Sequence, residues 1–209
     1  TGSVVSNFTF PTNQGLQVTF TTVTYGGNAY SNANGQKSGA DGISFFLSDG
    51  SKPATVGALG GSLGYSCSNG NPTYDGVQGG YIGLGIDEFG NFSNAGDNTN
   101  TGANANGGIG AIPGRISLRG AGNTNWAYLN SAYSSYYPSS LTASQRQAAV
   151  QKTCSTGTVW DYSNPSNPKK TSTKLSYNYN YITGDTLNGV TIYSQEATNN
   201  PTRGAATPI

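Results

Sequence analysis

The chain of 209 residues contains no histidine and no methionine. Without histidine, a hydrolase triad that relies on an imidazole base is excluded. There are two cysteines, Cys67 and Cys154, and two cysteines without a histidine do not make a structural zinc site. Catalysis by such a triad and zinc binding are therefore not expected.

Charged residues are also scarce: they make up 9% of the chain, and the formal net charge is +1. Nucleic acid and anionic membrane surfaces both need a dense basic surface on the protein, so neither is an expected partner. No run approaches the roughly 20 apolar residues of a transmembrane helix, so membrane insertion is not expected.

Aromatic residues are plentiful, with 14 Tyr, 7 Phe and 2 Trp, and they favour a packed core over disorder. A surface rich in Asn, Ser, Thr and Gly and poor in Lys and Glu is typical of secreted proteins, in which a widely spaced cysteine pair usually bridges. We therefore predict a Cys67–Cys154 disulfide, with two buried thiols as the alternative.

Apolar residues alternate with polar ones in several short segments, which predicts strands throughout. The predicted strands cover residues 16–25, 42–48, 79–87, 114–120, 174–182 and 189–195. The Gly- and Asn-rich stretch 96–114 is predicted to be a loop. Many short strands separated by turn residues indicate a β-sandwich or jelly roll, and 209 residues suit a single domain.

One segment, 141–154, departs from this pattern. Thr142 is followed three positions later by Gln145, as in a capping box, and helix-forming residues continue to Lys152. We predict a short helix inserted between strands. Upstream, the aromatic-rich stretch 125–138 is either a binding platform or packing for this insert.

Oxygen-bearing side chains follow the apolar strand in "GGYIGLGIDEFGNF" (79–92), where Asp87, Glu88 and Asn91 lie within five positions. Calcium takes about six to eight hard oxygen ligands, and D-x-F-x-N supplies a carboxylate, a carbonyl and an amide at alternating positions. The alternative is an Asx-rich turn in which these side chains bond their own backbone.

Three motifs in order carry a resemblance to a known family. They are "ADGISFFLS" (40–48), "GGSLGY" (60–65) and "YIGLGIDEFGNF" (81–92). Over roughly residues 2–120 the chain resembles the L-type lectins, the family of the legume lectins and their bacterial relatives. The resemblance implies an all-β fold, a concanavalin-like jelly-roll β-sandwich in which one calcium ion shapes the sugar site.

The resemblance also assigns roles to individual residues. Asp41 matches the aspartate that accepts hydrogen bonds from sugar hydroxyls, and the peptide bond before it is expected to be cis. Gly61 matches the glycine whose backbone N–H reaches the sugar. Asn91 matches the asparagine that binds calcium and sugar, and Asp87 matches the calcium carboxylate. Phe89 would give calcium its carbonyl and the sugar an aromatic face.

The chain departs from the legume lectins at a second metal. Those proteins hold a transition metal beside the calcium, using a glutamate and a histidine where this chain has Gly85 and Arg115, so we expect no transition-metal site. The family's last calcium aspartate falls near Ala95, which has no ligating side chain. We expect Asp97 to replace it, with Asn94 as the next candidate.

A second departure begins after the 120s. There the family continues with back-sheet strands and a loop that contributes to sugar selectivity, whereas this chain carries the helical insert over about residues 121–172. We therefore treat residues 1–209 as one lectin-like domain and expect the remaining strands to lie beyond residue 209 or to be missing.

Glycosidases also use concanavalin-like sandwiches, so an enzyme is an alternative to a binding protein. Retaining glycosidases need two carboxyl groups about 5 Å apart. Their positions around Asp87 are Gly85 with Gly90, or Gly85 with Phe89, so no enzyme activity is expected.

The sequence thus predicts a calcium-dependent carbohydrate-binding domain, a lectin or adhesin, of an exported bacterial surface protein or pilus-associated protein. Its partner would be a glycan or a glycoprotein, its location extracellular, and it would be part of a larger surface protein. The alternative is a structural or protein-interaction β-sandwich module that binds no sugar.

Overall fold

The computed structural model describes residues 2–6, 8–24, 30–31, 37–38, 40–94 and 115–182, and short strands within 185–208. Within 23–38 and 185–208 only the backbone of the strands is described. Asp97 and the predicted loop 96–114 lie outside the described residues.

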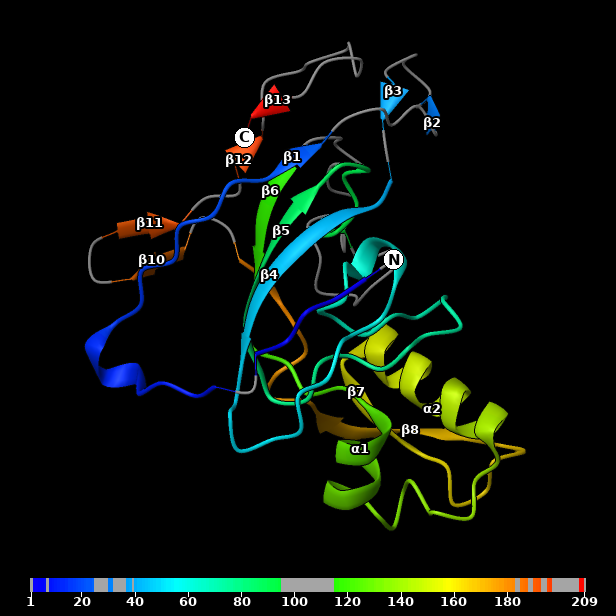
Figure 1. The fold of residues 1–209 in the computed structure, drawn as a ribbon. Helices are drawn as coiled ribbons and strands as arrows, with labels where there is room; N and C mark the ends of the chain where they lie inside the picture. The colour runs from blue at the N-terminus through cyan, green and yellow to red at the C-terminus, as the bar shows by residue number, and fades with distance from the viewer. Residues whose placement is uncertain are drawn as a thin grey trace.

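The largest sheet is antiparallel and has five strands (Figure 1). Its order is β12–β6–β5–β4, and β9 pairs with β6 beside β12. The bounds are β4 Gly42–Ser48, β5 Gly80–Asp87, β6 Arg115–Arg119, β9 Tyr181–Ile182 and β12 Gln195–Glu196. The strands predicted over 42–48, 79–87 and 114–120 are confirmed to within one residue at either end.

This central sheet has two unlike faces, because side chains alternate along each strand. The strand register gathers on one side, the apolar face, the side chains of Ile43, Phe45, Leu47, Ile82, Leu84, Ile86, Ile116 and Leu118. The other side, the mixed face, carries Ser44, Phe46, Gly83, Gly85, Asp87, Arg115, Ser117 and Arg119. The candidate site residues of β5 and β6 therefore share the mixed face.

The N-terminal segment contacts the apolar face: Phe20 stacks on Phe45 with ring centroids 5.9 Å apart. The strand predicted over 16–25 is wrong for residues 16–22, which are not in a strand. Only β1 (Val23–Thr24) forms, against β13 (Thr207–Pro208). A strand needs a hydrogen-bonded neighbour, and among the described residues none pairs with 16–22.

As a result, the second layer of the molecule is incomplete in the described part of the chain. Leu16, Val18 and Phe20 alternate as expected for a strand, yet each is 45–48% exposed. The described residues therefore form antiparallel sheets with two α-helices and do not close a two-sheet sandwich or jelly roll.

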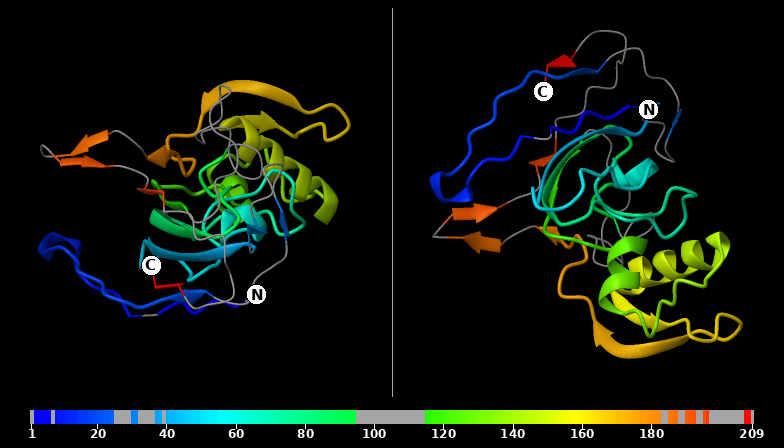
Figure 2. Two further views of the ribbon diagram at one scale, coloured as in Figure 1. Left: turned by 90° about the horizontal axis from the view of Figure 1, so that it is seen from above. Right: turned by 60° about the horizontal axis from the view of Figure 1, so that its bottom comes forward.

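The insert forms a small helical unit at one end of the central sheet (Figures 1 and 2). It contains α1 (Trp126–Ala132), α2 (Ala143–Thr156) and the hairpin of β7 (Thr158–Asp161) with β8 (Lys169–Lys174).

Shorter strand pairs elsewhere are β2 (Tyr30–Ser31) with β3 (Lys37–Ser38), and β10 (Asp185–Leu187) with β11 (Val190–Ile192). The strand predicted over 174–182 is wrong in its centre, since β8 ends at its first residue and β9 covers only its last two. Of the strand predicted over 189–195, β11 is confirmed.

The helix predicted over 141–154 is confirmed as α2. The Thr142 side chain accepts a hydrogen bond from the Gln145 N–H, and the Gln145 side chain accepts one from the Thr142 N–H, so the capping box is present. α2 ends at Gly157, whose φ of 61° suits glycine. Neither described helix is long and apolar enough to cross a membrane.

The shorter helix, α1, was not predicted. Asn125 caps it by accepting a hydrogen bond from the Tyr128 N–H. The aromatic side chains of 125–138 pack on the insert's own core around Leu129 and Val150, and Tyr137 is fully buried there. Packing, the second of the two alternatives for this stretch, is therefore what the structure shows.

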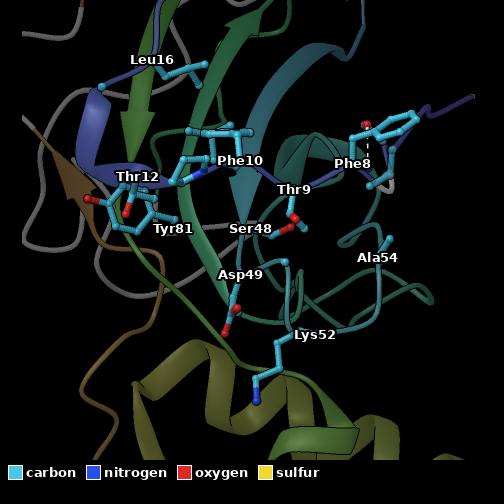
Figure 3. A pocket seen from close by; sticks show the side chains of 17 residues that line it. Phe8, Thr9, Phe10, Thr12, Leu16, Ser48, Asp49, Lys52, Ala54 and Tyr81 are labelled. Carbon is cyan, nitrogen blue, oxygen red and sulfur yellow. Dashed lines mark hydrogen bonds between the residues drawn. The ribbon is translucent and has the colours of Figure 1, made fainter.

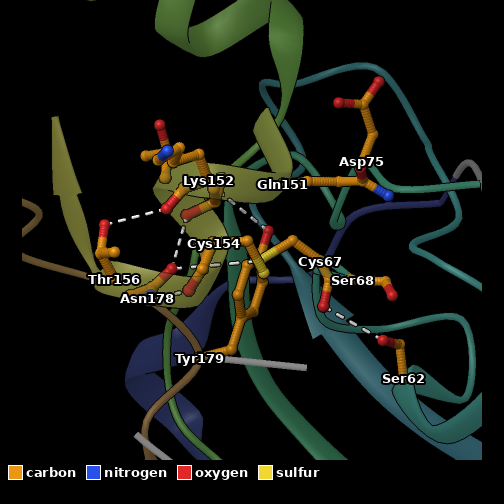
Figure 4. The surroundings of a disulfide bond; sticks show 12 residues. Ser62, Cys67, Ser68, Asp75, Gln151, Lys152, Cys154, Thr156, Asn178 and Tyr179 are labelled. Carbon is orange, nitrogen blue, oxygen red and sulfur yellow. Dashed lines mark hydrogen bonds between the residues drawn. A yellow bond between two sulfur atoms is a disulfide. The ribbon is translucent and has the colours of Figure 1, made fainter. Parts of the chain in front are cut away.

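The predicted disulfide Cys67–Cys154 is present and buried (Figure 4). It joins α2 to the loop that follows the short 3-10 helix η2 (Gly60–Ser62). Beside it, the Asn178 side chain donates to the Cys154 carbonyl and accepts from the Thr124 hydroxyl. The start of the insert and the segment after it are thus bonded to each other beside α2, and the disulfide bonds α2 to the loop after η2. A buried disulfide agrees with an extracellular protein.

Candidate functional site

The predicted site residues come from three segments that meet at one end of β4 and β5. Gly42 pairs with Asp87 in the sheet, and the Phe89 N–H donates to the Asp41 carbonyl over 3.0 Å. The Ala40–Asp41 peptide bond is cis, as expected. Asp41 and the loop after β5 are therefore directly connected.

Glycine makes this close approach possible. Gly42 has a φ of 141°, and a Cβ added there would lie 3.0 Å from the Glu88 nitrogen and would also overlap the Ile86 carbonyl. Only a residue without a side chain fits this conformation and this space. The Asp41–Gly42 pair of the "ADG" motif thus has a structural reason to be in this position.

The third segment is η2, which carries Gly61. A Cβ added to Gly61 would lie 2.6 Å from Cγ, Nδ2 and Oδ1 of Asn91. The backbone of Gly61 is therefore packed directly against the Asn91 side chain. Residues 41, 61 and 87–91, which belong to three segments that are far apart in the sequence, are brought together.

Asp87 lies at the centre of the loop that follows β5, and its carboxylate is fully buried. One oxygen accepts the Gly90 N–H over 2.7 Å and the other accepts the Phe92 N–H over 2.5 Å. Burial raises the pKa of Asp87 to about 7, against the hydrogen bonds from Phe92 and Gly90 and the nearby Arg115. These bonds are those of an Asx-rich turn, and they are also compatible with calcium binding, because each carboxylate oxygen keeps a second lone pair.

The oxygens of this loop fit calcium in kind. Asp87 offers a carboxylate, Phe89 a carbonyl and Asn91 an amide. Asn94 is only 6% exposed, and its Oδ1 has no hydrogen-bond partner in the described part of the chain. A buried amide oxygen without a partner is suited to bind a cation. This favours a ligand role for Asn94 over a purely structural one.

Calcium would depend on amide and carbonyl groups as much as on carboxylates. Among the described residues there is no cluster of three or more His, Cys, Asp or Glu side chains that could hold a metal ion. Asp97, the first candidate for the last ligand, lies outside these residues.

Two buried arginines of β6 support the loop from the mixed face, and sequence reasoning assigned neither a role there. Arg115 donates from Nη1 to the Ser93 hydroxyl over 2.9 Å. Arg119 donates to the carbonyls of Phe92 and Asn94. Burial lowers the pKa of Arg119 to about 9, so it remains cationic at neutral pH. The alternation of "RISLR" places both arginines on the same face as Asp87. This pattern in the sequence could have indicated that they lie near the loop.

Glycines on β5 leave room for aromatic rings over the mixed face. A Cβ added to Gly83 would lie 2.7 Å from Cε1 of Tyr65, and one added to Gly85 would lie 2.8 Å from Cγ of Phe92. The Tyr65 hydroxyl in turn donates to the Gly120 carbonyl. The position of the missing glycosidase glutamate, Gly85, is therefore covered by a ring.

No family model, curated protein or solved structure matches the chain. The site must therefore be interpreted from its own geometry.

Two hollows flank the N-terminal segment. One of about 700 Å³ is lined by Asp41 and Gly60 together with apolar side chains such as Val56 and Leu59, and adjoins the predicted site. The other, of about 810 Å³, lies between the N-terminal segment and the end of β4 and contains none of the predicted site residues (Figure 3). Its wall includes Phe8, Phe10, Leu16 and Tyr81. The hollow therefore lies between the N-terminal segment and the central sheet, where the second layer is incomplete.

Proposed function

We propose that the chain is a calcium-dependent carbohydrate-binding domain, a lectin or adhesin, displayed by an exported bacterial surface or pilus-associated protein. The observation that carries the proposal is the meeting of Asp41, Gly61 and Asn91 beside the Asp87 loop. Each comes from a different segment of the chain, so the fold has to bring them together.

The fold proposed for the complete domain is a concanavalin-like jelly-roll sandwich. The apolar face supports it, because a sheet side of this composition needs a second sheet to bury it. The N-terminal segment over that face keeps the alternating pattern of a strand in Leu16, Val18 and Phe20.

In the proposed site, Asp87, the Phe89 carbonyl and Asn91 would hold calcium, and Asp97, or else Asn94, would supply the last ligand. When bound, the ion supplies positive charge that neutralises Asp87 and fixes the orientation of the ligating oxygens. Asn91 is then held against Gly61 with its amide directed by the ion.

The same residues position the sugar. The Asp41 carboxylate accepts hydrogen bonds from sugar hydroxyls, and the Gly61 N–H and the Asn91 amide donate to its oxygens. The Phe89 ring provides an apolar face for the ring carbons. A shallow site with few contacts binds weakly, with a Kd of about 0.1 to 1 mM, and display of many copies supplies avidity.

The residues around Asp87 support sugar binding without hydrolysis of a glycosidic bond. A retaining glycosidase would need a second carboxylate on the same strand. At Gly85 the Phe92 ring occupies the space of a side chain. We therefore propose no enzyme activity.

Glycan binding tests the proposal. In calcium buffer the protein should bind a subset of glycans on an array, and chelation should abolish the signal. Asp41→Ala should lose binding and keep the melting temperature of the parent. The matched control is Asp161→Ala in β7, whose carboxylate is exposed and bonds locally with the N–H and side chain of Ser163. Retained glycan binding by Asp41→Ala would refute the assignment.

A second candidate function is a protein-interaction module, and the exposed apolar side chains of the N-terminal segment favour it. Val4 is 99% and Phe8 is 88% exposed, and exposed apolar patches are common at protein interfaces. This candidate would replace the first if the protein bound neither calcium nor glycans.

A further inference from the structure

We propose that Arg119 is the positioning residue that holds the calcium loop in its binding shape. The proposal rests on the calcium site proposed above. It adds a role for a residue outside the ligand set.

The contacts of Arg119 join two parts of the chain. Nε donates to the Phe92 carbonyl over 2.7 Å, and Nη2 donates to the Asn94 carbonyl over 2.8 Å. Nη1 donates to the Tyr179 carbonyl over 2.6 Å. One planar guanidinium thus fixes the end of the loop against the segment that returns from the insert.

The position of Arg119 in the sheet explains why it reaches the loop. It lies opposite Gly83 in the β5–β6 register, on the mixed face, where the Tyr65 ring occupies the space over the glycine. The guanidinium carbon lies 5.7 Å from the centre of the Phe92 ring, the same ring that covers Gly85. Arg119 is fully buried, so its orientation is fixed by these contacts.

The bonds made by Arg119 also fix the backbone that carries the Asn94 side chain. The carbonyls of Phe92 and Asn94 accept hydrogen bonds from the guanidinium, which sets their orientation. The Asn94 backbone is therefore fixed, while its Oδ1 has no partner among the described residues. Arg119 accordingly sets the place of the Asn94 side chain without touching the ion.

A lysine cannot replace this arrangement. Its ammonium is a point charge on a flexible stem, whereas the guanidinium presents donors in a rigid plane to three carbonyls at once. Arg119→Lys keeps the charge and loses the geometry. This variant separates positioning from simple charge compensation.

The test compares Arg119→Lys with Arg146→Lys, a matched control in the insert. Arg146 also donates to two carbonyls, those of Leu141 and Ser139, and lies over a tryptophan ring. Calcium affinity is measured by calorimetry. Amide exchange is measured at Gly90 and Phe92, whose N–H groups are bonded to Asp87.

We expect Arg119→Lys to bind calcium about tenfold more weakly or worse, as for loss of a hydrogen bond to a charged group. Exchange at Gly90 and Phe92 should be faster in the calcium-free variant, and Arg146→Lys should match the parent in both. Equal calcium affinity and equal exchange in Arg119→Lys would overturn the role of Arg119 and leave the calcium site standing.

Two further results complete the test. If the parent protein binds no calcium, both the site and this role fail. In the parent, the Nε–H resonance of Arg119 should be protected from exchange and should shift as calcium is added. A resonance that does not respond to saturating calcium would contradict the positioning role, whatever the folding of the variants.

Discussion

Gly61→Ala is the change whose effect follows most directly from the geometry. The added Cβ would lie 2.6 Å from three side-chain atoms of Asn91, which is too close for any real contact. Gly61 does not have a positive φ, so the backbone itself accepts alanine. The whole effect must therefore come from displacing Asn91 or the loop of η2.

The expected magnitude is that of overpacking a buried site, about 1–3 kcal/mol. If Asn91 moves, this energy is lost from calcium binding, which corresponds to an affinity reduced by about 5- to 150-fold. If the loop moves instead, the loss is seen in stability, at about 2–4 °C of melting temperature per kcal/mol for a chain of this size.

Calorimetric titration with calcium and thermal melting without it separate these two outcomes. The control is Gly70→Ala, because a Cβ at Gly70 meets nothing within 4 Å. Gly70→Ala should behave like the parent in both assays. A Gly61→Ala protein with unchanged calcium affinity and unchanged stability would show that Gly61 and Asn91 are not packed together, and the reasoning would be refuted.

Two further predictions concern the insert. Reduction of the Cys67–Cys154 disulfide, which links residues 87 positions apart, should destabilise the protein by about 4–5 kcal/mol on the chain-entropy model, measured as a lower midpoint of denaturant unfolding. Tyr137→Phe should cost about 1–3 kcal/mol, because it leaves the Trp160 N–H without the hydroxyl to which it donates over 2.8 Å.

Controls exist for both predictions. Tyr177 is 66% exposed, so Tyr177→Phe should leave the unfolding midpoint unchanged. An equal effect of the Tyr137 and Tyr177 variants would contradict the importance of the buried bond. An unchanged midpoint after verified reduction would show that the insert is held by its packing alone.

Local patterns predicted the central strands and α2 well. The period-two alternation of "GISFFLS" and "RISLR" and the capping box at Thr142 depend on neighbouring residues only, so the chain itself contains the signal. The site residues were predicted instead from the resemblance of three motifs, and close approach of distant segments accounts for glycine at positions 42 and 61.

Features that depend on distant partners were not predictable in the same way. Residues 16–22 have the strand pattern, but a strand forms only beside a neighbour, and no described segment pairs with them. Alternation placed Arg119 on the face of Asp87, but its bonds to Phe92 and Asn94 depend on the path of the loop. α1 was missed because its aromatic-rich sequence has no strong helix preference and its cap is the side chain of Asn125.

Calcium binding by the loop from Asp87 to Asn94 can be measured by calorimetric titration of chelator-treated protein. We predict one site, a higher melting temperature with calcium than without, and loss of both effects in Asp87→Asn. Absence of calcium binding, or equal binding by Asp87→Asn, would contradict the claim and identify the loop as a polar turn.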